Sequence, residues 1–350
     1  MQLTKSSRYI SRRLLGAGAA AVLSGTVPPT IDAQQPGAGG YTVPRTPWGD
    51  PDLQGKWPGT EMVGVPMQRD EKLGLRNVLD DEEFAERERR AAQQQEQDNA
   101  DFDLENTAST PGGAVGGAVS PPPHWLERGQ PQRQASLIVD PLNGRMPAFT
   151  QPAQDRQAAL RTSRQGRGPA DSYTDRSNYD RCITRGLAGS ILPVIYNNGT
   201  QIVQSPGYVA IVNEMIHETR VVPLDGRAHV GSTIKMWLGD SRGHWDGDTL
   251  VVETANFTDR TGVGVNGGGQ RHSEALKITE RYTRTADDVI DYQMTVDDPE
   301  TYTAPWTMQF PLKRDDAYGM FEYACHEGNL AMFNILSGAR ADDRAAAGRR

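Results

Sequence analysis

Residues 274–296 read EALKITERYTRTADDVIDYQMTV, and this stretch decides the fold class of the chain. Glu274 to Arg284 alternates apolar and polar residues, Thr285 to Asp288 reads as a turn, and Val289 to Val296 alternates again. A period of two residues is typical of a β-strand with one buried face. The stretch therefore predicts two neighbouring strands with a tight connection.

Similar apolar runs surround this stretch and extend the prediction to about nine strands. No helix long enough for a parallel crossover separates them, so the strands should be antiparallel, in a barrel or a sandwich. We predict a mainly β chain whose core is an antiparallel, lipocalin-like β-barrel, since about eight strands can enclose one small ligand. The other runs are Ala135–Val139, Gln201–Gln204, Tyr208–Met215, His217–Val222, Thr233–Leu238, His244–Val252 with an Asp246-Gly247 turn, Trp306–Leu312 and Met320–Cys325.

The first 33 residues have the parts of a signal peptide. Lys5 and Arg8 precede Ser11-Arg12-Arg13-Leu14-Leu15, an apolar region follows to Leu23, and Ile31-Asp32-Ala33 offers a cleavage site. The arginine pair before leucines resembles the twin-arginine export signal, and an ordinary secretory signal is the alternative. We expect the twin-arginine translocase as a partner during export and a periplasmic or secreted product.

The charge of the chain argues against one class of partner. The sequence has 37 basic and 45 acidic residues, a net charge of −8. Removal of residues 1–33 takes away four basic residues and one acidic residue, so the net charge becomes −11. Nonspecific nucleic-acid binding needs clustered lysine and arginine, so no nucleic-acid partner is expected. No later apolar stretch approaches twenty residues, so no membrane span is expected after cleavage.

Composition divides the rest of the chain into three parts. Residues 34–130 combine an irregular arm, a charged helix over Asp80–Gln97 and a Gly/Pro-rich linker at 108–123. Residues 131–340 hold the β-rich domain and its cover, which includes a helix predicted over Gln151–Arg161. Residues 341–350 are expected to form a disordered tail.

Cys182 and Cys325 are the only cysteines, and in an oxidising compartment the simplest prediction is a disulfide between them. The alternative is a reactive thiolate at Cys325 beside His326. Neighbouring residues of a strand point to opposite faces, so His326 is badly placed to activate Cys325.

The strand period predicts a buried acid. Leu276, Ile278, Glu280 and Tyr282 share one face, so Glu280 should lie among apolar side chains. A buried carboxylate is a candidate general acid or base, and an ion pair with an arginine is the equally available alternative. Tyr292 on the next strand should point to the same interior, either to orient a ligand or as a core tyrosine. A pairing of Glu280 with arginine away from any cavity would exclude the catalytic assignment.

Two histidines in the strand-rich region, His217 and His326, complete the predicted catalytic set with Glu280. Glu214 and His217 have the Glu-x-x-His spacing that places both groups on one helical face, as in carboxylate-bridged metal sites. Only one copy occurs, and its neighbours favour a strand, so we predict no metal site and no cofactor.

Polar groups at strand ends are the predicted ligand-binding residues. Asn197 and Asn329 lie in such loops, together with Glu214, and amide side chains can bind a hydroxylated ligand. Turn and cap chemistry is the alternative for both asparagines. The glycine-rich run 262–269 lacks the lysine of a phosphate-binding loop, so it is interpreted as a flexible loop.

Several blocks together resemble a family of uncharacterised exported bacterial proteins. The blocks are Thr46–Gly55, which contains Trp-Gly-Asp-Pro-Asp-Leu-Gln-Gly, the run Tyr196–Met215, the block Trp237–Arg242, and Glu322–Asn329, which reads Glu-Tyr-Ala-Cys-His-Glu-Gly-Asn. The resemblance spans most of the chain after the signal peptide and thins over residues 80–125. It implies export and a single unit, and it carries no activity with it.

These observations predict an exported enzyme that acts on a small organic molecule by cofactor-free acid/base chemistry, as a lyase, isomerase or hydrolase. The first alternative is a lipocalin-like protein that binds a small molecule without chemistry. The second is a metal-dependent enzyme with ligands from distant strands.

Overall fold

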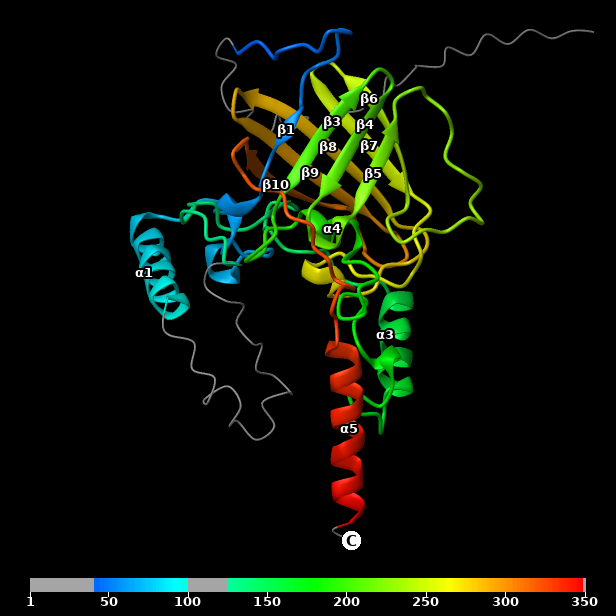
Figure 1. Cartoon of the computed structure of the whole chain (residues 1–350). Coiled ribbons are helices and arrows are strands. Elements are labelled where there is room, and N and C mark those ends of the chain that lie inside the picture. Colours follow the sequence, from blue (N-terminus) through cyan, green and yellow to red (C-terminus); the bar gives the residue numbers. More distant parts are fainter. Residues whose placement is uncertain (1–40, 100–124, 349–350) are drawn as a thin grey trace, which may run out of the picture. The chain divides into compact units, whose positions relative to one another are not determined.

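The computed structural model describes residues 41–99 and 125–348 (Figure 1). The predicted signal peptide and the predicted linker at 108–123 lie outside the described residues. In the described part, ten strands form two antiparallel sheets, with the orders β1-β3-β4-β5 and β2-β10-β9-β8-β7-β6. The strands are β1 (Gly55–Lys56), β2 (Ile138–Asp140), β3 (Thr200–Ser205), β4 (Tyr208–Asn213), β5 (Thr219–Pro223), β6 (Asp240–Asp246), β7 (Thr249–Ala255), β8 (Lys277–Ala286), β9 (Val289–Asp297) and β10 (Trp306–Lys313).

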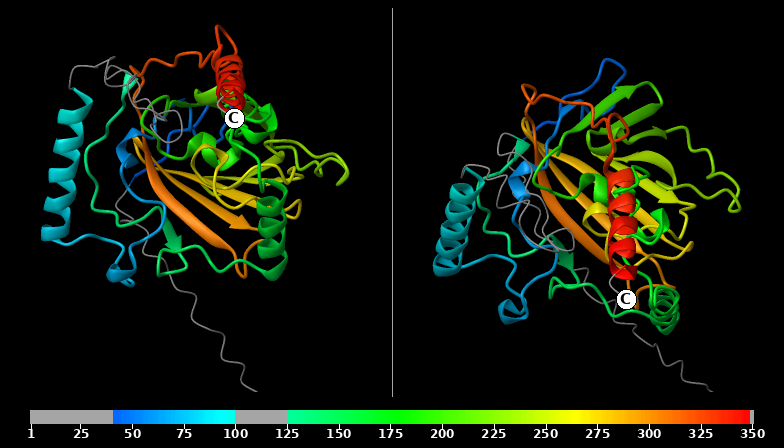
Figure 2. Two further views of the ribbon diagram at one scale, coloured as in Figure 1. Left: turned by 90° about the horizontal axis from the view of Figure 1, so that it is seen from below. Right: turned by 60° about the horizontal axis from the view of Figure 1, so that its bottom comes forward.

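The mainly β, antiparallel prediction is confirmed, but the described strands do not close into a barrel. The smaller sheet lies over the larger one, and no strand ladder joins the two among the described residues (Figures 1 and 2). Both sheets contribute to one hydrophobic core, which includes Ile211 of β4, Leu250 of β7 and Tyr292 of β9. Packed side chains therefore occupy the space where a barrel would hold its ligand.

The alternation in residues 274–296 forms β8 and β9 as expected. Ile278 and Tyr282 on β8 and Ile290 and Tyr292 on β9 are buried, whereas the alternate residues Thr279, Arg281 and Asp291 are partly exposed. Each fully buried large apolar side chain stabilises the fold by roughly 1.5–3 kcal/mol relative to its exposed state. A slip of one residue would turn this face to water, so the pattern also determines the register.

The hairpin of β6 and β7 differs from its prediction by one residue. Asp246 pairs with Thr249, so the two turn residues are Gly247 and Asp248 instead of Asp246 and Gly247. Gly247 has a φ of 60°, in the left-handed region that glycine adopts without steric cost.

Two predicted strands are absent from the structure. Residues 233–238 lie in the long loop between β5 and β6, where Ile234 is 53% exposed and Met236 forms one isolated bridge with Phe257. Residues 320–325 are an irregular segment. Both stretches alternate in sequence, but neither pairs with a strand of the sheets, and a strand needs a partner for its backbone groups.

Four α-helices accompany the sheets in the described residues. The predicted charged helix is confirmed as α1, which Asp80 caps through the capping box with Glu83.

The predicted tail is a helix as far as Ala347, so the disordered-tail prediction is wrong for residues 341–347. The alanine-rich sequence of this segment explains the helix, because alanine has the highest helix propensity. The helices are α1 (Asp81–Asp98), α3 (Gln151–Ser163), α4 (Gly186–Ile191) and α5 (Ala331–Ala347), with 3-10 turns η1 (Thr60–Met62), η2 (Glu71–Leu73), η5 (Tyr173–Asp175), η6 (Met215–His217) and η7 (Val265–Gly267).

Cys182 and Cys325 form the predicted disulfide, which joins segments 143 residues apart in the sequence. Disulfides persist in oxidising compartments, so this bond indicates a non-cytoplasmic environment. No helix within residues 41–99 or 125–348 has the length and apolar character needed to cross a membrane.

Candidate functional site

Glu280 lies in the core between the two sheets and is paired with an arginine. Its two carboxylate oxygens accept hydrogen bonds of 2.5 and 2.9 Å from Arg220 of β5, and Glu280 is 0% exposed. Tyr282 and Tyr292 both donate to Oε1, at 2.8 and 2.9 Å. The structure thus contains the ion pair that was the alternative to catalysis, and Glu280 does not line the cavity beside β10 described below.

Electrostatics in this cluster favour the charged pair. Burial lowers the pKa of Arg220, but the charge of Glu280, its hydrogen bonds to Arg220 and the two nearby tyrosines together raise the pKa overall. Burial and the same carboxylate raise the pKa values of Tyr282 and Tyr292, so both phenols keep their protons for donation. Tyr292 lies in the same interior as Glu280, as expected, and its hydroxyl belongs to this hydrogen-bonded core network. We therefore leave Glu280 and Tyr292 out of the site proposed below.

Glu214 and Asn197 come together at the base of the β3–β4 hairpin. Asn197 Nδ2 donates to Glu214 Oε1 at 2.8 Å, and the backbone N–H of Phe321 donates to the same oxygen at 3.0 Å. The hydroxyl of Tyr318 lies 2.7 Å from Glu214 Oε2 and 2.8 Å from Glu127 Oε1. These contacts fix residues 318–321 against the hairpin, so both predicted ligand-binding residues have a positioning role.

The turn that follows β4 is strained. Ile216 and His217 have φ values of 56° and 46°, which place two consecutive non-glycine residues in the left-handed region. A β-branched residue rarely adopts such a conformation, and strain of this kind clusters at functional sites. The strand predicted over Tyr208–Met215 therefore ends at Asn213, and the strand predicted from His217 begins at Thr219. The strained turn between them sets the direction of the His217 side chain.

Arg185 is the most unusual charged residue in the described chain. It is 1% exposed, it forms no ion pair with a described carboxylate, and its Nε has no hydrogen-bond partner among the described residues. Nη2 contacts Asn266 Oδ1, and the guanidinium lies 5.3 Å from the ring centre of Tyr179. Burial lowers its pKa, although a guanidinium keeps its proton in proteins. The charge of Glu218 acts on Arg185 without a direct ion pair, and a buried cation that lacks a directly paired anion is costly.

Three tyrosines form a hydroxyl chain beside Arg185. The hydroxyl of Tyr179 lies 2.7 Å from that of Tyr196 and 3.0 Å from that of Tyr323. Burial, followed by these hydrogen bonds, raises the pKa of Tyr179, and burial raises the pKa of Tyr323. All three side chains are partly exposed. Tyr179 and Tyr323 are therefore protonated, and a ligand can reach the edge of the tyrosine chain.

Glu218 adds a second polar group next to α4. Its carboxylate contacts the hydroxyls of Thr184 and Ser190, and Arg185 interacts with it electrostatically. Burial raises the pKa of Glu218, whereas the two hydroxyls and Arg185 lower it by less. Glu218 thus anchors the start of β5 to α4, beneath the tyrosine chain.

His217 has the geometry of a general base. Its Nδ1 lies 3.2 Å from the backbone oxygen of Tyr323, and because a carbonyl only accepts, Nδ1 carries the proton of the neutral ring. Nε2 is then unprotonated, and the side chain is exposed. The sequence prediction of His217 as an acid/base residue is consistent with this tautomer but is not tested by it.

His326 and Asn329 lie on the segment after the disulfide. His326 is exposed, and its backbone oxygen accepts a hydrogen bond from Asn329. Asn329 Nδ2 donates to the backbone oxygen of Cys325 at 2.8 Å, and its Oδ1 accepts from the N–H of Ala331 at the start of α5. Asn329 therefore has the turn role that was its alternative, one residue before Leu330, the N-cap of α5.

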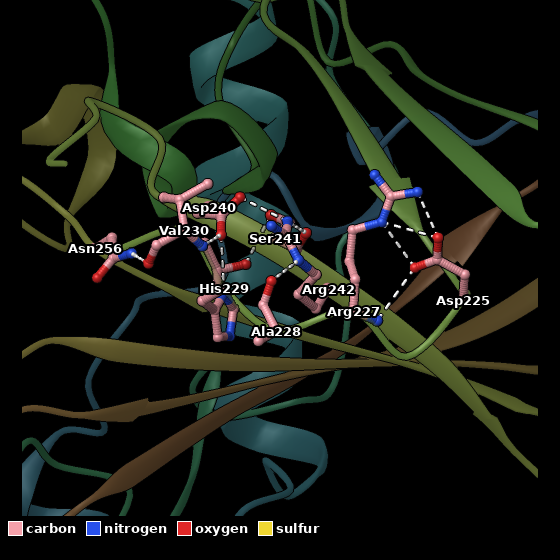
Figure 3. A network of polar contacts seen from close by, with 10 residues as sticks. Asp225, Arg227, Ala228, His229, Val230, Asp240, Ser241, Arg242 and Asn256 are labelled. Carbon is pink, nitrogen blue, oxygen red and sulfur yellow. Dashed lines mark hydrogen bonds and ion pairs between the residues drawn. The ribbon is translucent and has the colours of Figure 1, made fainter. Parts of the chain in front are cut away.

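A separate polar network anchors the loop between β5 and β6 (Figure 3). Asp240 accepts hydrogen bonds from the backbone N–H of Val230 at 2.9 Å, from His229 Nδ1 at 3.2 Å and from Arg242 at 2.6 Å. Arg242 also donates to the backbone oxygen of Ala228. The His229–Asp240 pair resembles the orienting half of a catalytic dyad, but no described hydroxyl or thiol contacts His229, so we interpret it as a loop anchor.

The residues that sequence reasoning missed are Arg185, Tyr179, Tyr196, Tyr323 and Glu218. A signal for two of them exists in the sequence. Arg185 lies three residues after Cys182 and Tyr323 two residues before Cys325, so the predicted disulfide places them close together. Within residues 41–99 and 125–348, no group of three or more His, Cys, Asp or Glu side chains has the arrangement of a metal site.

No protein-family model matches the chain, and neither curated proteins nor solved structures gave a match.

Proposed function

We propose that this protein is an exported enzyme that moves a proton on a small organic carboxylate, as a lyase or isomerase, at a site formed by Arg185, Tyr323 and His217. The observation that carries the proposal is the buried Arg185 guanidinium, which has an unpartnered N–H and lies against a chain of protonated tyrosines. Export, to the periplasm or outside the cell, is supported by the disulfide and by the arginine pair near the start of the sequence.

In this proposal Arg185 binds the carboxylate of the substrate. Abstraction of the proton on the neighbouring carbon moves negative charge onto the carboxylate oxygens, and a cation in a partly dry site stabilises that charge. Arg185 interacts electrostatically with Glu218, but the Glu218 carboxylate hydrogen-bonds with the hydroxyls of Thr184 and Ser190, which leaves the unpartnered Nε–H of Arg185 for the substrate.

His217 Nε2 takes the proton from carbon, and the hydroxyl of Tyr323 returns one to the leaving group or to the same carbon. The two groups are linked through the contact of His217 with the Tyr323 backbone. The imidazole of His217 serves as the base and the Tyr323 phenol, whose pKa is raised, as the acid, so the reaction needs no cofactor. Tyr323 is partly exposed and His217 is exposed, so a substrate would approach from that side and the proposal no longer needs a barrel interior.

The test is proton exchange in deuterated water. Purified protein would be incubated with a panel of 2-oxo acids and hexuronates, and ¹H NMR would follow loss of the proton next to the carboxylate or carbonyl. We expect exchange or elimination with at least one compound, a loss of about 10²–10⁴ in rate for His217→Gln, and a comparable loss for Arg185→Gln. His244→Gln, at an exposed histidine of β6, is the matched control.

Two outcomes would overturn the proposal. One is turnover that persists in folded Arg185→Gln and His217→Gln variants. The other is binding of a panel compound with no exchange, which would favour the carrier instead of the enzyme.

A further inference from the structure

The outer edge of β10 borders a cavity of about 240 Å³, away from Arg185 and the tyrosine chain. Its lining comes from four parts of the fold. The residues are Asn77, Val78, Gln134, Val139 of β2, Asp291 of β9, and Gln309, Phe310 and Pro311 of β10. We propose that this cavity binds a neutral monosaccharide.

The cavity exists because β10 is longer than its neighbour β2. β2 pairs with β10 only at Met308 and Thr307, with a register shift between them. Beyond Met308, the N–H of Gln309 still reaches the backbone oxygen of Leu137, but Pro311 has no N–H to offer a further strand. The edge is therefore left open beside Pro311.

The opposite wall is fixed by backbone contacts. Val78 forms a bridge with Gln134, and the N–H of Ala135 donates to the oxygen of Asn77 at 2.8 Å. The side chain of Gln134 then reaches across, and its Nε2 donates to the backbone oxygen of Gln309 at 2.8 Å. Both walls are thus held in place without a ligand, and preformed sites lose less entropy on binding.

The polar groups of the cavity are rich in acceptors. Gln309 Nε2 donates to both oxygens of Asp291 at 3.0 Å, and Gln293 Nε2 donates to Oδ2 at 3.1 Å. Asp291 forms no ion pair with a described Lys, Arg or His. The amide donors of Gln134 and Gln309 are engaged within the protein, whereas their Oε1 atoms accept no hydrogen bond from described residues.

These acceptor groups favour a ligand with several hydroxyl donors. Asp291 and the two glutamine oxygens accept from hydroxyls, and the Asn77 amide both donates and accepts. Val78, which is 53% exposed, and Pro311 offer an apolar surface for the C–H face of a sugar ring. The volume lies just below the 300–1,000 Å³ of sites for larger ligands, which favours a single sugar unit.

The test is a titration of the purified protein with D-glucose, D-galactose and D-mannose, followed by ¹H–¹⁵N NMR. We expect at least one sugar to shift the signals of residues 77–78 and 309–311, and Asp291→Ala to weaken that binding at least tenfold. Asn77→Ala, at an exposed loop residue, tests the site if Asp291→Ala does not fold. Thr295→Ala is the matched control, because Thr295 lies on the same face of β9 but does not line the cavity.

The proposal is overturned if none of the three sugars binds, or if binding is unchanged in folded Asp291→Ala or Asn77→Ala. It is also overturned if putrescine binds this cavity and no sugar does, since the carboxylate would then select an ammonium. Binding that is lost in Arg185→Gln but kept in Asp291→Ala would assign the sugar to the other site.

Discussion

Arg220 of β5 and Glu280 of β8 join the two sheets through paired hydrogen bonds, although they are 60 residues apart in the sequence. Each uses two atoms, which fixes both the separation and the orientation of the strands. Glu280 also accepts from Tyr282 and Tyr292, so all four polar groups of the cluster are satisfied inside the core. The cluster therefore specifies how the smaller sheet lies on the larger one.

Removal of one partner of this pair should destabilise the fold strongly. Glu280→Ala leaves the buried Arg220 charge without its partner, and we expect a loss of about 3–5 kcal/mol in the free energy of unfolding. Urea denaturation measures the change. The double variant Arg220→Leu/Glu280→Leu is the matched control and should lose much less, because it leaves no isolated charge. Equal losses in both proteins would show that the ion pair is not the cause.

Tyr318→Phe should loosen the segment that leads to the disulfide. The substitution removes the hydroxyl that contacts both Glu127 and Glu214, and we expect a loss of about 1–3 kcal/mol with faster amide exchange at residues 319–321. Exchange measured by mass spectrometry tests this. Tyr208→Phe is the control, because the Tyr208 hydroxyl contacts only exposed Arg227. Unchanged exchange in Tyr318→Phe would refute the positioning role given to Glu214.

The strands were predictable where one face of a sheet is buried. β8, β9 and β10 show a clear alternation because each packs one face on the core, so the sequence period follows the burial directly. The same alternation in residues 233–238 marks no strand, since a local period carries no information on whether a pairing edge is available. Closure into a barrel also depends on which strands pair at the edges of the sheets, and the residue pattern within a single strand does not specify that pairing.

The candidate site was harder to predict because its residues come from loops. Glu280 was correctly placed in the interior, but its role depends on Arg220 from another sheet, and no local pattern links the two. Arg185 and Tyr323 are brought together by the disulfide and by a turn with left-handed residues. Loops have no period, so only the cysteine pairing pointed toward this region.

Asp240→Asn should release the loop between β5 and β6. The amide of Asn has only one acceptor oxygen, so it cannot accept both from Val230 and His229, which now donate to Oδ2, and from Arg242, which donates to Oδ1. We expect trypsin to cut at Lys235 several-fold faster than in the wild-type protein, as followed by mass spectrometry. Asp225→Asn is the matched control, since Asp225 contacts only Arg227 within the same loop. A cleavage rate equal to that of the control would contradict the anchor role.

His272 should make the stability fall as the pH decreases below neutral. Burial lowers the pKa of His272, although the hydrogen bond to Ser273 and the charges of Asp298 and Asp259 oppose the shift. Its Nδ1 lies 3.0 Å from the Ser273 backbone oxygen and its Nε2 2.8 Å from the Thr261 hydroxyl, so the neutral ring is fully hydrogen-bonded when Nδ1 donates to Ser273 and Thr261 donates to Nε2.

The direction of this pH effect follows from the pKa of the histidine in the unfolded chain and in the folded protein. In the unfolded chain the pKa of a histidine is about 6.5, and in the folded protein it is lower, so the unfolded state takes up the proton first. Neutral His272 contributes its full stabilisation of the folded state above pH about 6.5. Below that pH the free energy of unfolding decreases, by at most about 1.4 kcal/mol per pH unit, until the pH reaches the lowered pKa of the folded protein. Urea denaturation of His272→Gln between pH 7.5 and about 5 should show a shallower slope than the wild-type protein. The control His244→Gln, at an exposed position, should keep the wild-type slope, and an unchanged slope in His272→Gln would assign the acid sensitivity to other groups.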